Sequence, residues 1–151
     1  MTVADSASFA DESAKTGGLD IQRVCVINAR RLTVRVTVDD YRHTFCEDEA
    51  SLWVDTHPRR PGPEFFMGSG LYERDWQIVR TRGWCIVGRR PLNCPVKQLL
   101  DPAREVMSWT TGPACLGSYS RVRVSVTTGP ANGTTDHSPA YHRLHRWVTR
   151  Y

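Results

Sequence analysis

Lysine is nearly absent from this sequence of 151 residues: Lys15 and Lys97 are the only lysines among 20 basic residues, and the others are arginines. The arginines are spread along the chain, without the clustered basic face and interleaved aromatic residues typical of a nucleic-acid-binding surface. We therefore expect no nucleic-acid partner. Long apolar runs are absent as well. No segment reaches the roughly 18 consecutive apolar residues that a membrane-spanning helix needs, so we expect no membrane span.

Catalytic and cofactor-binding motifs are also missing. The sequence has no GxSxG nucleophile elbow, no HExxH zinc motif and no phosphate-binding loop. An enzyme would have to be assembled from scattered residues, such as Glu64 and Glu73 as a carboxylate pair, or His137 next to Asp136 as a base. Strand alternation alone does not bring these side chains to a defined separation. A binding or structural role is therefore favoured over catalysis.

The five cysteines show neither a CxxC pair nor a Cys/His spacing typical of zinc sites. Disulfide bonding is therefore favoured over metal binding, although an odd number leaves at least one cysteine unpaired. The N-terminal segment lacks the basic and apolar regions of a signal peptide. Cysteine usage favours an extracellular or cell-envelope location, with a cytoplasmic location as the alternative.

Residues 1–19 are polar and show neither the period of a strand nor that of a helix, which predicts a flexible leader. Residues 20–151 fit the usual size of one domain.

Strand periodicity dominates the rest of the chain. Leu32, Val34, Val36 and Val38 alternate with Arg and Thr residues, the pattern of a half-buried strand. A turn over residues 28–30 joins this strand to a preceding one over residues 21–27. Further short β-rich runs, separated by Gly, Pro, Asn or Asp, cover residues 52–55, 76–82, 96–100, 105–110 and 121–127. The pattern predicts an all-β fold, an antiparallel two-sheet β-sandwich of the jelly-roll or immunoglobulin-like kind.

Three pieces of sequence carry a family resemblance: LDIQRV at residues 19–24, LTVRVTVDD at residues 32–40, and SLWVDTHPRRPGP followed by GSGLYERDWQIVRTRGW at residues 51–63 and 68–84. Together they resemble the carbohydrate-binding modules of family nine and the related DOMON-like sandwiches. In those families a strand ends in an Asp-Thr pair, here Asp55-Thr56. A Pro/Gly turn follows, and the next strand starts with an Asp-aromatic pair, here Asp75-Trp76.

A second resemblance involves Val54-Asp55-Thr56, the corner Pro61-Gly62-Pro63-Glu64, Cys94, and Cys115-Leu116-Gly117. These pieces are similar to small exported actinobacterial proteins of unassigned function, which share the corner and a pair of cysteines near the last strands. This chain departs from them in also having Cys25, Cys46 and Cys85. The resemblance implies an exported β-sandwich.

Exposed aromatic rings bind sugars in such sandwiches, because the apolar C–H face of a sugar packs on an indole while hydrogen bonds fix its hydroxyls. Of the five tryptophans, Trp53 lies opposite in phase to Leu52 and Val54, and Trp84 lies just beyond a strand. Trp53 and Trp84 are therefore the candidate ligand-binding residues. Core packing is the alternative for each.

Calcium is the one cofactor that the resemblance suggests, because some related sandwiches hold a structural calcium ion near a sheet edge. Asp20, Asp55 and Asp75 are its candidate ligands. Alternatively, Asp55 caps a turn by accepting backbone N–H groups. His142 and His145 could start a metal site if the C-terminal segment were helical, but a third ligand is missing, and surface histidines are the alternative.

Cys94 and Cys115 are predicted to form a disulfide. Cys94 precedes the strand over residues 96–100, and Cys115 follows the strand over residues 105–110. If these strands form an antiparallel hairpin, the two cysteines lie side by side. Cys25, in phase with Ile21 and Ile27, is predicted to be a buried free thiol.

These observations favour a non-catalytic binding or structural module outside the cytoplasm, with a carbohydrate or cell-envelope glycan as first-choice ligand. The alternatives are an enzyme on the same scaffold and a protein-interaction module that uses a sheet face or an edge strand.

Overall fold

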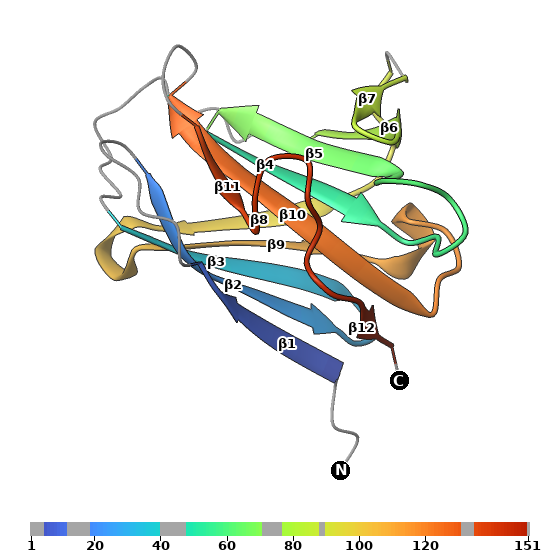
Figure 1. The fold of residues 1–151 in the computed structure, drawn as a ribbon, viewed down its shortest axis with the longest axis horizontal. Helices are drawn as coiled ribbons and strands as arrows, with labels where there is room; N and C mark the ends of the chain where they lie inside the picture. The colour runs from blue at the N-terminus through green and yellow to red at the C-terminus, as the bar shows by residue number, and fades with distance from the viewer. Residues whose placement is uncertain are drawn as a thin grey trace.

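A computed structural model describes residues 5–11, 19–39, 48–70, 77–87, 90–130 and 135–150. Nearly all regular structure in this part of the chain is antiparallel β-strand, accompanied by two short 3-10 turns, η1 (Pro102–Arg104) and η2 (Pro113–Cys115). The strands form two sheets that pack against each other, which confirms the predicted all-β sandwich (Figure 1). Among the described residues, no helix is long and apolar enough to cross a membrane.

The first sheet has five strands, in the spatial order β1-β2-β3-β9-β8. Its members are β1 (Asp5–Ala10), β2 (Asp20–Asn28), β3 (Leu32–Asp39), β9 (Val106–Thr111) and β8 (Val96–Asp101). The hairpin between β2 and β3 and the strands β8 and β9 lie where the sequence predicts them.

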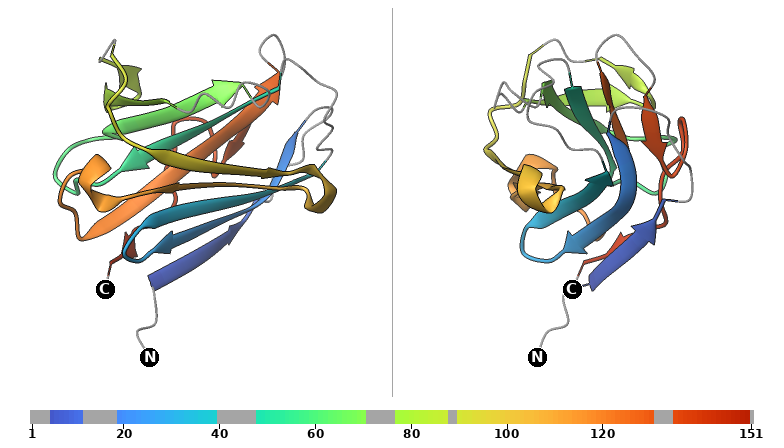
Figure 2. Two further views of the ribbon diagram at one scale, coloured as in Figure 1. Left: turned by 180° about the vertical axis from the view of Figure 1, so that it is seen from behind. Right: turned by 90° about the vertical axis from the view of Figure 1, so that its left-hand side faces the viewer.

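The second sheet has seven strands, and β10 (Arg121–Pro130) is its longest. One side of β10 pairs with β4 (Asp48–Asp55), and the other side pairs with β11 (Asp136–Ser138) and β12 (Val148–Thr149). Beyond β4 follow β5 (Phe65–Gly70), β6 (Gln77–Arg82) and β7 (Cys85–Ile86). The views in Figure 2 show how the two sheets face each other.

The core forms between the sheets because alternate residues of each strand point inward. Val34, Val36 and Val38 of β3 are fully buried, and so are Val124 and Val126 of β10. The intervening Arg and Thr residues of β3 are exposed or half-buried. Burial of these apolar side chains is the main favourable contribution to folding.

Buried hydrogen bonds join the two sheets at both ends. Asp136 accepts a bond from the backbone N–H of Ile21 at 2.7 Å, and Thr128 donates to the carbonyl of Leu19 at 2.9 Å. At the other end, Asn28 donates to the carbonyl of Val148 at 2.8 Å. Because these are directional bonds between residues over 100 positions apart, they fix how one sheet sits on the other.

The predicted flexible leader over residues 1–19 needs a correction, because β1 lies within it and pairs with β2 along its length. Ala7 and Phe9 point toward the core, whereas Ser6 and Ser8 are exposed. The Phe9 ring also stacks on His145 with ring centroids 4.3 Å apart. The alternation went unrecognised because the other residues of this strand are too small to give a clear period-two pattern.

The predicted burial of Cys25 is also corrected. A shift of register between Ile21 and Arg23 interrupts the pairing of β2 with β3. A β-bulge of this kind reverses the side-chain phase of the strand. Ile21 therefore faces the core, whereas Cys25 lies on the outer side and is half-buried as a free thiol.

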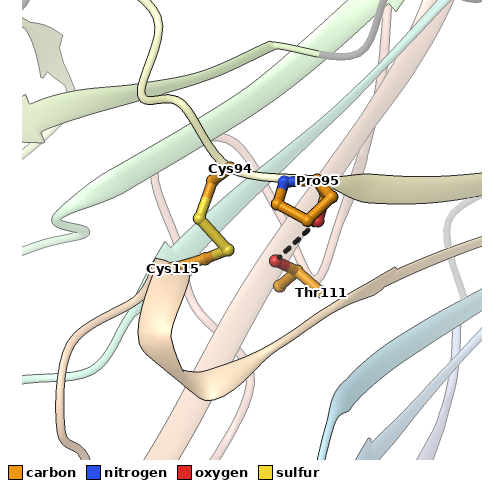
Figure 3. The surroundings of a disulfide bond; sticks show 4 residues. All are labelled: Cys94, Pro95, Thr111 and Cys115. Carbon is orange, nitrogen blue, oxygen red and sulfur yellow. Dashed lines mark hydrogen bonds between the residues drawn. A yellow bond between two sulfur atoms is a disulfide. The ribbon is translucent and has the colours of Figure 1, made fainter.

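Cys94 and Cys115 form the predicted disulfide, with Cα atoms 5.5 Å apart. Figure 3 shows the bond joining the segment before β8 to the turn after β9. Beside it, the Thr111 hydroxyl donates to the carbonyl of Pro95 at 3.5 Å. The antiparallel pairing of β8 with β9 brings the cysteines together, as the sequence predicts.

Removing this disulfide is expected to lower the free energy of unfolding by about 3 kcal/mol, because the bond closes a loop of 21 residues and reduces the entropy of the unfolded chain. Denaturant unfolding of a Cys94→Ala/Cys115→Ala variant without reductant measures the loss. Cys25→Ala, which removes a thiol outside the bond, is the matched control. A double variant as stable as the parent would contradict the prediction.

Candidate functional site

The outer face of the second sheet brings together side chains from four strands. Strand register places Trp53 of β4 between Phe66 of β5 and Ser125 of β10. Two residues further along each strand, on the same face, Ser51 lies next to Thr127. In the same row, Thr127 pairs with His137 of β11. The inward neighbours of Trp53 on β4, Leu52 and Val54, are buried. Trp53 therefore points away from the core, as its strand phase predicts.

Aromatic rings form a continuous chain over this face. The Trp53 ring lies 4.7 Å from Phe66 and 5.3 Å from Trp84, measured between centroids. Trp84 in turn stacks on His142, with centroids 4.8 Å apart and ring planes 9° from parallel. His142 stacks on Tyr141 at 3.8 Å, and Tyr141 meets the ring of His137 at 5.2 Å. The two tryptophans selected from the sequence thus lie side by side.

These rings line a pocket of about 180 Å³, which we call the aromatic pocket. Its lining consists of Ser51, Trp53, Phe66, Trp84, Ser125, Thr127, His137, Tyr141 and His142. Trp53 and Trp84 are half-buried, whereas Tyr141 is 67% exposed. The volume is smaller than the roughly 300 to 1,000 Å³ of pockets that enclose a small molecule. The arrangement suits one face of a flat, partly apolar ligand.

Two glycines hold Trp84 in place. Gly62 and Gly83 both have positive φ, +77° and +58°, which favours glycine. A Cβ atom on Gly62 would lie only 2.6 Å from the Cα of Gly83. The corner between β4 and β5 therefore touches the turn between β6 and β7, and Trp84 follows directly from this contact.

The floor of the aromatic pocket depends on a third glycine, Gly68 of β5. A Cβ atom at this position would lie 2.8 Å from two ring atoms of Phe66. The Phe66 ring therefore lies across the backbone of Gly68, in the space that a side chain would occupy.

Asp55, at the end of β4, is fully buried and forms an ion pair. Its Oδ2 accepts hydrogen bonds from Nε and Nη2 of Arg123, each at 2.7 Å. Its Oδ1 accepts the backbone N–H of His57 at 3.1 Å, which is the turn-capping role considered for this residue. Both carboxylate oxygens are thus occupied, and the guanidinium balances the charge.

Glu64 lies beside this pair. Its Oε2 accepts the backbone N–H of Thr56 at 2.8 Å. Burial, together with the nearby charge of Asp55, raises the pKa of Glu64 to about 7. The two neighbouring carboxyl groups therefore differ: Asp55 forms the ion pair with Arg123, whereas Glu64 keeps its proton up to nearly neutral pH.

Two of the three predicted calcium ligands, Asp20 and Asp55, are not brought to one place. Asp20 adjoins Leu19, which bonds to Thr128, whereas Asp55 pairs with Arg123. Thr128 and Arg123 are about 16 Å apart along β10 at the usual rise of a strand. Asp75, like Trp76 and Glu73, lies outside the described residues.

A different group of carboxylates occurs at the end of the sandwich, where one oxygen each of Asp11, Asp20 and Asp136 lies within 4.8 Å of the others. Asp136 uses its two oxygens for the backbone N–H groups of Ile21 and His137. Calcium generally takes six to eight oxygens. Among the described residues this group supplies three carboxylates, and we assign it no ligand.

The histidines have separate environments. His145 is buried, contacts the Ser138 hydroxyl at 3.0 Å, and has its pKa lowered to about 4 by burial. His142 instead stacks in the aromatic pocket, so the two do not form the metal pair considered from sequence. The imidazole nitrogens of His137 lie 3.2 and 3.0 Å from the hydroxyls of Thr127 and Thr135. Sequence reasoning did not assign Phe66 or Tyr141 to a site and considered His142 only as a metal ligand. Tyr141 and His142 come from an irregular segment without periodicity.

Comparison with known proteins assigns the chain to no family. No family model matches it, and no curated protein matches it significantly. The resemblance to carbohydrate-binding modules of family nine stays a prediction. The function must therefore be argued from the site, because a sandwich fold supports many functions.

Replacing Glu64 by glutamine is expected to change how stability depends on pH. The pKa of Glu64 rises from 4.5 to about 7 on folding, so its ionisation destabilises the folded state as the pH rises through that interval. Glu64→Gln cannot ionise and still offers an oxygen to Thr56. Its melting temperature should exceed that of the parent at pH 8, and the gain should disappear at pH 4.5.

Glu49→Gln, which removes a carboxyl group at an exposed position of β4, is the matched control. An equal difference between Glu64→Gln and the parent at both pH values would show that Glu64 titrates normally.

Proposed function

We propose that this chain is a non-catalytic binding module that acts outside the cytoplasm and binds a carbohydrate at the aromatic pocket. The observation that carries the proposal is the convergence of Trp53 and Trp84, whose ring centroids are 5.3 Å apart on the outer face of one sheet. Aromatic faces held this way match the apolar C–H faces of sugars.

The polar residues of the aromatic pocket support the same ligand class. Ser51, Thr127 and Tyr141 add hydroxyl groups, and His137 and His142 add imidazole nitrogens. A sugar presents hydroxyls around an apolar ring face, so it needs hydrogen-bonding groups beside an aromatic platform. The small volume of about 180 Å³ favours stacking of one or two sugar rings at the surface over enclosure of a whole ligand.

The lining of the aromatic pocket argues against glycoside hydrolysis, the nearest enzymatic alternative. Glycosidases generally use two carboxyl groups that flank the scissile bond. Among the described residues, the lining of this pocket contains no Asp or Glu. Glu64 lines a different pocket. A binding role therefore requires fewer assumptions than catalysis.

The disulfide supports a location outside the cytoplasm. Structural disulfides form and persist in oxidising compartments and are rare in the cytosol. The Cys94–Cys115 bond closes the open end of the β8–β9 hairpin, and Cys25 and Cys85 are free thiols. A cell-envelope or secreted glycan is consistent with that location.

Trp53→Ala and Trp84→Ala are each expected to weaken glycan binding about fivefold, since stacking on an aromatic ring contributes on the order of 1 kcal/mol. A glycan array identifies the ligand, and isothermal titration calorimetry with the best glycan compares the variants. Thermal unfolding checks that each variant keeps its fold.

Trp147→Ala is the matched control. Trp147 packs under the guanidinium groups of Arg121 and Arg123, at 5.0 and 4.5 Å from its ring centroid, and does not line the aromatic pocket. It should leave glycan affinity unchanged. If the protein binds none of the glycans and cell-wall fractions tested, the proposal is wrong.

A further inference from the structure

A second pocket, of about 570 Å³, lies where the corner between β4 and β5 meets the end of β6. Three arginines line it: Arg60 from the corner, and Arg80 and Arg82 from β6. The remaining lining comes from Pro61, Pro63, Glu64, Thr81, Gly83 and Val87. We call this the arginine pocket. Its positive side chains come from segments about 20 residues apart, so the clustering is visible only in the folded chain.

No acidic residue of the described ranges balances the charges of these arginines. In the part of the chain that the structure describes, Arg123 pairs with Asp55 and Arg104 pairs with Asp101, but Arg60, Arg80 and Arg82 form no ion pair. All three are exposed. Guanidinium groups that converge without a carboxylate partner offer bidentate hydrogen bonding to an oxyanion.

Among the described residues, Glu64 is the one carboxyl group that lines the arginine pocket, and it opposes the arginines only weakly. Its pKa of about 7 means that it is largely protonated in mildly acidic solution. Its Oε1 is buried and has no hydrogen-bond partner among the described residues. The pocket therefore keeps a net positive charge.

Hydrogen bonds hold the backbone around the arginine pocket in place. The Thr81 hydroxyl donates to the carbonyl of Pro63 at 2.7 Å, and the Thr81 N–H donates to the carbonyl of Glu64 at 2.8 Å. The close approach of Gly62 to Gly83 closes one side. Because this backbone is already held in place, a ligand has to order only the arginine side chains.

We propose that the arginine pocket binds the carboxylate or phosphate groups of the same glycan whose sugar rings stack in the aromatic pocket, so that the ligand is an acidic glycan. This inference rests on the proposed function. Gly83 lines the arginine pocket and Trp84 lines the aromatic pocket, so consecutive residues of one turn connect the two sites. Arg80 lies opposite Phe65 on the core side of the sheet, whereas Trp53 and Phe66 lie on the outer side, so a polymeric ligand that uses both sites passes around the end of the sheet at this turn.

The test compares charged and neutral forms of one polymer. Polygalacturonate and its fully methyl-esterified form share the same sugar and differ in charge, and a glycerol-phosphate polymer bearing sugars supplies the phosphate alternative. The protein should bind at least one charged polymer about tenfold or more tightly than the esterified one, since charge-assisted hydrogen bonds are the strong ones. If neither charged polymer binds more tightly than the esterified one, the inference is overturned.

Two variants with the same change in net charge distinguish binding at the arginine pocket from attraction of the charged polymer to the net positive charge of the protein. Arg60→Gln/Arg80→Gln/Arg82→Gln should lose the preference for the charged polymer. Arg30→Gln/Arg31→Gln/Arg35→Gln, at exposed positions of the first sheet and its β2–β3 turn, should keep it. Equal losses in both triple variants would show that only net charge matters. The single variant Arg82→Gln provides the same comparison if the triple variant unfolds.

The tryptophan variants distinguish failure of this inference from failure of the proposed function. If Trp53→Ala weakens binding of both polymers while the arginine-pocket variant behaves like the parent, the glycan site stands and the acidic preference is wrong. If the arginine-pocket variant abolishes binding while Trp53→Ala and Trp84→Ala have no effect, the aromatic pocket is not the glycan site, and the inference falls with it.

Discussion

The register of β4 between β5 and β10 is the constraint on which both sides of the second sheet depend. In this register Leu52 and Val54 complete the core, while Trp53 and the buried Asp55 lie on the opposite side of the sheet. A slip of one residue would exchange the two sets, because side chains alternate along a strand. The buried pair of Asp55 with Arg123 holds the register at one end, since these residues lie opposite each other only in this alignment.

The corner after β4 connects the two pockets. Asp55 caps its start, Glu64 ends it, and the contact of Gly62 with Gly83 joins it to the turn that carries Trp84. Pro63 of the corner also contacts β6, because its carbonyl accepts the Thr81 hydroxyl at 2.7 Å. A ligand would meet a surface that is already formed, which lowers the entropic cost of binding.

Much of this arrangement could be predicted from the sequence. The alternation around β3 predicts the sandwich, strand phase predicts that Trp53 faces outward, and the spacing around β8 and β9 predicts the Cys94–Cys115 bond. Other features could not be predicted. The bulge in β2 changes the phase of Cys25, and the partner of Asp55 lies 68 residues away in Arg123. Tyr141 and His142 reach the aromatic pocket from a segment without periodicity, so only the three-dimensional structure places them there.

The central claim is that the outer face of the second sheet recognises a glycan through Trp53 and Trp84. Nuclear magnetic resonance of the indole N–H groups during titration with a bound glycan tests it most directly. The account predicts that the signals of Trp53 and Trp84 shift with the ligand while that of Trp109, which is buried in the core, stays in place. Shifts confined to other tryptophans, or to residues of the first sheet, would contradict it.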